Sequence, residues 1–193
     1  MDFSKVITIE DDESYLRQVS KDARKDDPEL EDNIKYISEF CKDNEVLAMA
    51  SVQLGIPKKL IYIKSTKEDS FLLEHVEDEA IVMINPKIIE EEGESIYWEC
   101  CASCMDNMGL VRRPYRVKVR YLDADFNEKE ETLEGFKATV FSHEYDHLFG
   151  ILHMDIAEKL MVMSVDERHV FRQKEENKYK VLRKTGKYKH PLR

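Results

Sequence analysis

Residues 141–150 read FSHEYDHLFG, and they place His143 and His147 four positions apart with Glu144 beside the first histidine. In an α-helix, positions i and i+4 lie one above the other on the same face, so both imidazoles can point at one cation. Glu144 is then placed to take a proton from metal-bound water and to deliver it later to a leaving group. The pattern favours a catalytic metal-binding helix. The alternative is a charged helix with two histidines and a surface carboxylate.

A catalytic metal commonly has three protein ligands and an open position, so a third ligand must lie outside this helix. Downstream of it, four side chains carry suitable donor atoms: His153, Asp155, Glu158 and His169. None of them has the spacing that metzincin proteases use. Upstream, three thiols crowd into five positions: Cys100, Cys101 and Cys104. A thiolate binds divalent transition metals well, so one of these cysteines can complete the site.

Cys101 and Cys104 also form a C-x-x-C pair, which leaves two further interpretations open. A redox pair would be expected at the start of a helix in a βαβ unit, and the surrounding sequence has no such pattern. A structural zinc site made of two cysteines and two histidines would leave Glu144 without a role. Both interpretations account for less of the sequence than a catalytic site does.

The composition is that of a globular chain with one domain. Of its 193 residues, 42% are hydrophobic and 36% are charged, and no apolar run is long enough to span a membrane. The N-terminal sequence MDFSKVITIEDDESYL has neither the basic stretch nor the apolar run of a secretion signal. We therefore expect a cytoplasmic protein, or an organellar one in a eukaryotic host, with no membrane partner.

The net charge of −10 is unevenly distributed. Residues 172–193 contain nine Lys or Arg and two Glu, so the preceding 171 residues carry a formal charge of −17. The acidic body should repel DNA, whereas the basic C-terminal tail can contact RNA or an acidic protein surface. Alternatively, this tail is a solvated or self-docked end. The expected organisation is one domain over residues 1–171, followed by the basic tail at 172–193.

Hydrophobic periodicity predicts an α+β domain. Residues 27–43 have apolar side chains at helical spacing, with Asp27 as the candidate N-cap and Pro28 at the first helical position. Four more elements follow in the sequence: a β-rich run at 58–65, another at 80–89 that the Asn85-Pro86 turn signal interrupts, an alternating strand within 115–123, and a hairpin return after it.

Two helices are expected in the C-terminal half of the chain. The first runs from Phe136 to Phe149 and carries the two histidines, and Gly150 is placed to stop it. The second would occupy the long charged segment from about Asp155 to Tyr179.

Three motifs, in this order, resemble those of the peptide deformylase family, metal hydrolases that remove the formyl group from N-formylmethionine at the start of new bacterial polypeptides. The family's G-h-G-h-A-A-x-Q, where h is hydrophobic, appears as VLAMASVQ at 46–53, its E-G-C-L-S as ECCAS at 99–103, and its H-E-x-D-H as HEYDH at 143–147. Shorter segments also match: INP at 84–86, GLVRRP at 109–114, GFKA at 135–138 and HLFGIL at 147–152. The resemblance covers roughly residues 6–160.

The resemblance implies an α+β fold in which antiparallel sheets pack around a central HExxH helix, with N-terminal and C-terminal helices. It makes residues 1–171 a single catalytic domain of the deformylase type. It further implies that Cys101, His143 and His147 hold one divalent metal, natively Fe(II), with Zn, Ni or Co able to replace it. One thiolate and two imidazoles do not by themselves choose among these metals.

The same resemblance assigns the remaining catalytic roles. A metal-bound water would attack the formyl carbon, with Glu144 as general base and then general acid. Gln53 and the backbone N–H of Ala102 would stabilise the developing oxyanion. Residues against the substrate would be Leu47, Ala48, Glu99 and Cys100. Behind the ligands, Asp146 would pair with Arg113 and so help to orient them.

The chain departs from the family pattern around the substrate. In the first motif, Val46 and Ala48 replace glycines and Ser51 replaces an alanine. In the second motif, Cys100 replaces a glycine and Ala102 replaces a leucine. Because glycine often marks a close approach of backbone to ligand, we expect these changes to alter the width of the substrate pocket and its preference for methionine.

The leading hypothesis is a metal-dependent hydrolase that removes the N-formyl group from N-formylmethionyl peptides. One alternative is a deformylase-like metal-binding protein with weak or no turnover. Another is an amidohydrolase or metalloprotease that acts on a different acyl group. The expected partners are N-formylated nascent peptides, and the basic tail can dock on ribosomal RNA.

Overall fold

The computed structural model describes residues 4–66 and 75–193. Its helices and helical turns are α1 (Ile9–Leu16), α2 (Leu30–Asp43), η1 (Ser51–Leu54), η2 (Ala102–Cys104), α3 (Gly135–His147), α4 (His153–Ile156), α5 (Val165–Gln173) and η3 (Glu175–Asn177). Its strands are β1 (Ala48–Ala50), β2 (Leu60–Thr66), β3 (His75–Cys100), β4 (Asn107–Arg113), β5 (Arg116–Leu122), β6 (Glu128–Glu134), β7 (Lys159–Val162) and β8 (Lys180–Lys187). This mixture confirms the predicted α+β fold. Among the described residues, no helix has the length and apolar character needed to cross a membrane.

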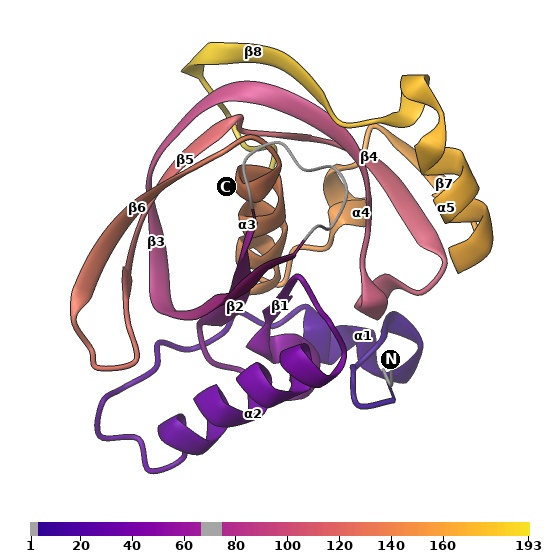
Figure 1. The fold of residues 1–193 in the computed structure, drawn as a ribbon. Helices are drawn as coiled ribbons and strands as arrows, with labels where there is room; N and C mark the ends of the chain where they lie inside the picture. Colours follow the sequence, from indigo (N-terminus) through magenta and orange to yellow (C-terminus); the bar gives the residue numbers. More distant parts are fainter. Residues whose placement is uncertain (1–3, 67–74) are drawn as a thin grey trace.

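One long, curved strand organises the sheet. β3 pairs along its length with β2, β5, β8 and β4, and each of these pairings is antiparallel. β1 extends the sheet beyond β2, β6 beyond β5, and β7 beyond β4. Figure 1 shows β3 curving around α3, which lies inside the bend. The structure thus confirms an antiparallel arrangement around a central HExxH helix.

The helix α3 is buried on nearly every side. Every residue from Phe141 to Leu148 is buried. The apolar side chains of α3 pack in one core cluster with residues of β1, β2, β5 and β6, among them Ile61, Val119 and Leu133. Because α3 has almost no solvent face, its histidines and carboxylates must find their partners inside the protein.

The end of α3 agrees with the sequence. The helix ends at His147, and Gly150 has a left-handed backbone with φ of 70°. A Cβ atom at this position would stand 2.0 Å from the carbonyl oxygen of Arg17, just after α1. Glycine therefore lets the two helix ends approach each other.

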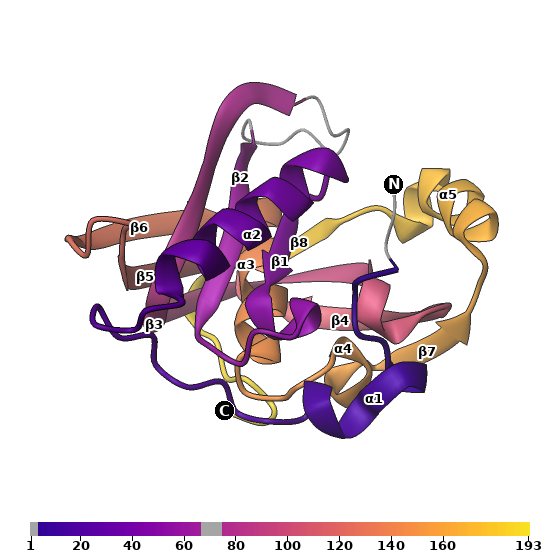
Figure 2. The ribbon, with the colours of Figure 1, turned by 90° about the horizontal axis from the view of Figure 1, so that it is seen from below.

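The predicted start of α2 was two residues too early. The helix begins at Leu30, with Glu29 at the N-cap position. Asp27 lies in the preceding turn, where its carboxylate accepts a hydrogen bond from the backbone N–H of Glu29 at 3.1 Å and forms an ion pair with Lys58. Asp27, the candidate N-cap, is therefore held by an ion pair with a distant lysine and lies outside the helix. Figure 2 shows α2 lying across β1 and β2, which it covers.

The Asn85-Pro86 signal does not interrupt the strand. β3 continues through it, and the register with its neighbours shifts between Ile84 and Lys87. Asn85 has a φ of 50°, and its side-chain amide bonds both the N–H and the C=O of Ala23, at 2.7 and 2.8 Å. The dipeptide therefore makes a β-bulge that bends the strand, not a turn that ends it.

The prediction of one helix from about Asp155 to Tyr179 was wrong. The segment contains α4, the edge strand β7 that pairs with β4, and the short helix α5. Ser164 begins α5 with a capping box to Glu167. The segment that becomes β7 pairs with the open edge of β4. This pairing divides a stretch whose local sequence alone favours one helix.

Part of the basic tail is docked on the sheet of the same chain. This is the self-docked arrangement that the sequence left open. β8 pairs with β3 between Glu92 and Ile96, and Arg183 forms an ion pair with Glu94 at 3.0 Å. Gly93 has a φ of 69°, and a Cβ there would stand 2.6 Å from the Arg183 carbonyl oxygen. Glycine at this position therefore permits the close approach of the two strands.

Candidate metal centre

Three donor side chains converge at one end of β3. Cys101 follows the last residue of the strand, and His143 and His147 project from α3. The three donor atoms lie within 4.8 Å of one another, and all three residues are buried. His147 Nε2 is 3.3 Å from both Cys101 Sγ and His143 Nε2. Within the described part of the chain, no other group of His, Cys, Asp or Glu side chains has this geometry.

The residues present fit a divalent transition metal. Two nitrogens bound tetrahedrally at about 2.0–2.1 Å from zinc stand roughly 3.3–3.4 Å apart, which matches the observed separation. His143 donates its Nδ1 hydrogen to Glu99, so its Nε2 presents a lone pair to His147. The ring nitrogen of His143, the imidazole of His147 and the thiol of Cys101 face one another in a buried space. One shared cation would satisfy all three groups.

Glu99 and Arg113 support His143 through its Nδ1 atom, the ring nitrogen that does not face His147. Glu99 is 4% exposed and accepts hydrogen bonds from His143 Nδ1 at 2.9 Å and from Arg113 at 2.8 and 2.9 Å. Burial alone would raise the pKa of the Glu99 carboxyl, but the Arg113 guanidinium and the bond from His143 hold that pKa well below its usual range. The charged carboxylate fixes the tautomer of His143. The side chain of Glu99, which the sequence analysis placed against the substrate, thus lies behind a ligand.

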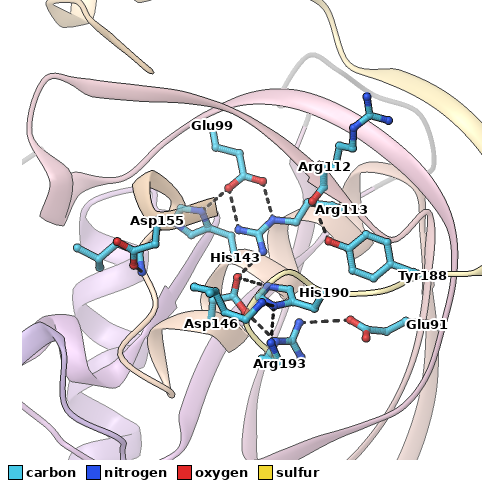
Figure 3. Close-up of polar contacts among 12 residues, drawn as sticks. Glu91, Glu99, Arg112, Arg113, His143, Asp146, Asp155, Tyr188, His190 and Arg193 are labelled. Carbon is cyan, nitrogen blue, oxygen red and sulfur yellow. Dashed lines mark hydrogen bonds and ion pairs between the residues drawn. The ribbon is translucent and has the colours of Figure 1, made fainter. Parts of the chain in front are cut away.

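Asp146 lies on the other side of the same guanidinium. Its carboxylate is 1% exposed and pairs with Arg113, as the family resemblance implied. Burial raises the pKa of Asp146, but the charge of Arg113 and a hydrogen bond from His190 outweigh burial and lower it to about 2. Figure 3 shows Arg113 between the two carboxylates. The guanidinium therefore ties the end of β3 to α3.

Glu144 is buried beside the ligands and is held by β1. Its Oε2 atom accepts a hydrogen bond from the backbone N–H of Ala50 at 2.8 Å. Burial raises the pKa of Glu144 to about 7, and the neighbouring Cys101 adds to this effect, while His143 and the Ala50 N–H oppose it. A carboxyl group with this pKa can both accept and donate a proton near neutral pH.

Gln53 reaches the same centre from η1. Its side-chain Nε2 lies 3.2 Å from Cys101 Sγ and 3.1 Å from Ser103 Oγ, and its Oε1 accepts from Ala50 N–H at 3.1 Å. The amide is therefore oriented with its donor toward the thiol. Ala102 begins η2, directly after Cys101, and its side chain is exposed. This position puts its peptide next to the thiolate ligand.

The other residues predicted to bind substrate lie around this centre. Leu47 and Ala48 are half-buried at the start of β1, where the Leu47 carbonyl accepts a hydrogen bond from Lys64 N–H at 2.9 Å. Cys100 is half-buried, and its Sγ accepts a hydrogen bond from Arg172 of α5 at 3.1 Å. Cys100 therefore links β3 to the helix that follows β7.

The remaining candidate ligands are not among the three residues whose donor atoms converge. Asp155 pairs with Arg17, and Glu158 pairs with Arg112. His169 is exposed on α5, and the His153 ring stacks on His143 with centroids 5.7 Å apart. Cys104 packs in an apolar cluster with Leu16, Leu152 and Cys101, and it is not one of the three residues whose donor atoms converge. Of the candidates open in the sequence, Cys101 is the one that meets both histidines.

Four residues that contact the surroundings of the centre carry no recognisable signal in the sequence. His190 and Arg193 contact Asp146, and Arg168 and Arg172 of α5 bond the backbone at Met105 and Trp98. No local motif marks these residues, because they lie in a basic segment where charge alone suggests a solvated tail. Their partners are 44 to 74 positions away in the sequence.

Comparison with known proteins gives one consistent result. A family model described as polypeptide deformylase matches residues 4–162, so residues 163–193 lie beyond the match. A peptide deformylase from Mesorhizobium japonicum is 38% identical over 146 residues, which cover 75% of this chain and 80% of the relative.

Solved structures agree. A probable peptide deformylase from Synechococcus phage S-SSM7 has 34% identity and a TM-score of 0.66, covering 78% of this chain and 97% of that one. A class I type b peptide deformylase from Acinetobacter baumannii with Met-Ala-Ser bound has 28% identity and a TM-score of 0.67, covering 78% and 95%. The chain therefore belongs to the polypeptide deformylase family.

Proposed function

We propose that this chain hydrolyses the N-formyl group of N-formylmethionyl peptides, giving formate and a free amino terminus. The observation that carries the proposal is the meeting of Cys101, His143 and His147 beside the buried carboxyl of Glu144. Membership of the deformylase family supports the same reaction. The Met-Ala-Ser bound to the Acinetobacter relative supports a peptide that begins with methionine as the substrate class.

Cys101, His143 and His147 would hold one divalent cation. When bound, such a cation acts as a Lewis acid toward the formyl oxygen and lowers the pKa of water. We assign Fe(II) as the native metal on the family resemblance, with Zn, Ni and Co as substitutes. A site of one thiolate and two imidazoles accepts each of these metals.

Glu144 would move the proton. Its carboxylate is held by the N–H of Ala50 beside His143, so it can take a proton during attack and donate it to the leaving amine. The pKa of about 7 places both protonation states within reach at neutral pH. The Gln53 amide and the Ala102 backbone N–H would donate to the oxyanion that develops on the formyl oxygen.

Leu47, Ala48 and the backbone at Glu99 and Cys100 would border the substrate. Val46 replaces a family glycine, and it packs against the cluster under α2 that contains Phe40 and Met49. Ala48, the other replaced glycine, packs against the central core cluster. Both side chains are half-buried and pack against core clusters, so the fold accommodates the two replacements.

The deciding experiment measures formate release from formyl-Met-Ala-Ser. Anaerobically purified protein would be reconstituted with Fe(II), Ni(II) or Zn(II), beside Glu144→Ala and the exposed control Glu39→Ala. We expect turnover by the parent and by Glu39→Ala, and loss by about 10²–10⁴-fold in Glu144→Ala with the metal still bound.

Each contrary result has a distinct meaning. Stoichiometric metal binding without turnover by the parent would favour a deformylase-like binding protein. Cleavage of internal peptide bonds would favour a metalloprotease. Full activity in Glu144→Ala would remove Glu144 from the mechanism.

We further infer that the protein works in the cytoplasm on nascent chains and that its basic segment docks on ribosomal RNA. The exposed lysines that follow α5 offer the charge: Lys174, Lys180, Lys184, Lys187 and Lys189. Contacts between cations and phosphates weaken as salt rises. Replacing Lys180, Lys184 and Lys187 by Ser should lower co-sedimentation with ribosomes at low salt, while Lys35→Ser on α2 should not. Equal co-sedimentation of both variants would contradict docking through this segment.

A further inference from the structure

The chain after β8 returns to the metal-holding helix. Residues 188–193, here termed the clamp, leave the outer strand and pass beside α3, where Figure 1 places the C-terminal label. The Tyr188 hydroxyl donates to the Arg112 carbonyl at 2.9 Å, and Tyr188 is 5% exposed. The His190 side chain is 3% exposed. The clamp is thus seated inside the protein at two points.

Two clamp side chains meet on Asp146. His190 Nε2 lies 3.1 Å from Asp146 Oδ2, and Arg193 Nε lies 3.0 Å from Asp146 Oδ1. The guanidinium of Arg193 also pairs with Glu91 at 3.3 Å and lies over the Tyr145 ring at 4.8 Å. Figure 3 shows His190, Arg193 and Arg113 around the one carboxylate. Asp146 is therefore fixed from two sides.

The hydrogen-bond pattern defines the direction of the His190 contact. His190 Nδ1 accepts from the backbone N–H groups of Leu192 and Arg193, each at 3.1 Å. That nitrogen must present its lone pair, so Nε2 carries the hydrogen and donates it to Asp146. The local turn of the clamp thus sets the imidazole in the tautomer that Asp146 needs.

A continuous path leads from the clamp to a metal ligand. Asp146 pairs with Arg113, Arg113 bonds Glu99 with two nitrogens, and Glu99 accepts the Nδ1 hydrogen of His143. Arg113 alone would face two buried carboxylates with one positive charge. Arg193 supplies a second positive charge beside Asp146. Arg113 therefore does not have to compensate the charge of Asp146 alone, and its attraction to Glu99 is preserved.

We propose that His190 and Arg193 are positioning residues of the metal centre, which act through Asp146, Arg113 and Glu99 to orient His143. The clamp lies beyond residues 4–162, which match the deformylase family model. Groups that bond a metal ligand directly typically change metal affinity by about 10–100-fold when removed, and this range is the upper limit for side chains that act through such a group. The inference rests on the proposed metal site.

The test measures metal affinity with the whole 193-residue chain. Zn(II) and Co(II) affinities would be determined by competition with a chelator, and the Co(II) absorption spectrum would report ligand geometry. The variants are His190→Ala/Arg193→Gln, His190→Gln and Arg193→Gln, with the exposed neighbour Lys189→Ala as the matched control. Thermal unfolding would establish that each protein is folded.

We expect the double variant to bind both metals more weakly, by about 10-fold, the lower end of the range for direct partners of a ligand, with altered Co(II) bands. Arg193→Gln should show the same change in smaller measure, and it remains informative if the double variant does not fold. His190→Gln keeps an N–H donor and should stay close to the parent. Lys189→Ala should match the parent in affinity and spectrum.

Unchanged affinity and spectrum in folded Arg193→Gln and in the folded double variant would overturn the inference. An equal loss in Lys189→Ala would overturn it as well, because that side chain does not contact Asp146. Failure of the parent chain to bind either metal would instead overturn the proposed function on which the inference rests.

Discussion

Arg113 is a fully buried charge at the back of the site. Its side chain is 1% exposed and lies between Glu99 and Asp146, both nearly as buried. Removing one partner of a buried ion pair leaves the other charges uncompensated in a medium of low polarity. The neighbouring Arg112 also pairs with carboxylates, but its side chain is 46% exposed. The adjacent pair thus offers a matched comparison of buried and exposed charge.

We therefore expect Arg113→Met to lower the free energy of unfolding by about 3–5 kcal/mol. Arg112→Met should change it by about 1 kcal/mol or less, because exposed pairs contribute little. Urea unfolding followed by circular dichroism would measure both values. Equal small effects in the two variants would mean that water reaches the Arg113 site.

Gln53 is the side-chain donor that we propose for the oxyanion. Its Nε2 lies 3.2 Å from Cys101 Sγ, while its Oε1 is held by Ala50 N–H. Removing one donor to a developing oxyanion typically costs about 10²–10³-fold in kcat. We expect that loss for Gln53→Ala, with a smaller change in KM, from formate-release kinetics. The control Gln18→Ala should keep the parent rate, and a rise in KM with unchanged kcat would argue against the oxyanion role.

At the scale of elements, α3 is held by packing on all its sides. Phe141 is fully buried in the cluster that joins the helix to β2, β5 and β6. Large-to-small changes at such sites cost the lost transfer free energy and leave a cavity. Phe141→Ala should therefore lower the free energy of unfolding by roughly 3–5 kcal/mol.

An exposed residue on another helix provides the control. Val170 on α5 is 61% exposed, so Val170→Ala should stay within about 0.5 kcal/mol of the parent. Denaturant titrations of both variants would measure the difference. A cost for Phe141→Ala as small as that for Val170→Ala would show that α3 is less tightly packed than its burial indicates.

The boundaries predicted from local sequence agree with the structure where no contact with a distant element alters them. The strand predicted within 115–123 forms as β5, because alternation of apolar and polar residues matches the two faces of a strand. Asp27, Asn85 and the segment around β7 depart from local expectation. Each is engaged by a distant element: Lys58, Ala23 and the edge of β4.

At the scale of the whole molecule, metal binding should add to a fold that already has its own core. The described helices and strands bury apolar clusters that contain none of the three ligands, so the metal-free chain should stay folded. A ligand present at 1,000 times its Kd adds about 4.1 kcal/mol to the free energy of unfolding. Removal by a chelator should lower the Tm correspondingly without loss of secondary structure.

A variant without the thiolate tests the source of that shift. Cys101→Ala should show a chelator-induced Tm change much smaller than that of the parent, whereas Cys41→Ala should respond as the parent does. Differential scanning calorimetry with and without chelator would measure this. An undiminished response in Cys101→Ala would place the stabilising metal elsewhere.

The sequence by itself determined the parts of this protein that depend on short-range geometry. The spacing of His143 and His147 defines one helix face, and the order of three motifs indicates the family. From the residues alone, three cysteines remained candidates for the third ligand. The tertiary structure decided that Cys101 meets the histidines, that Glu99 lies behind His143, and that His190 and Arg193 reach Asp146. These contacts join residues 44 or more positions apart, and they depend on how a curved strand and a buried helix satisfy each other's polar groups, which no local pattern encodes.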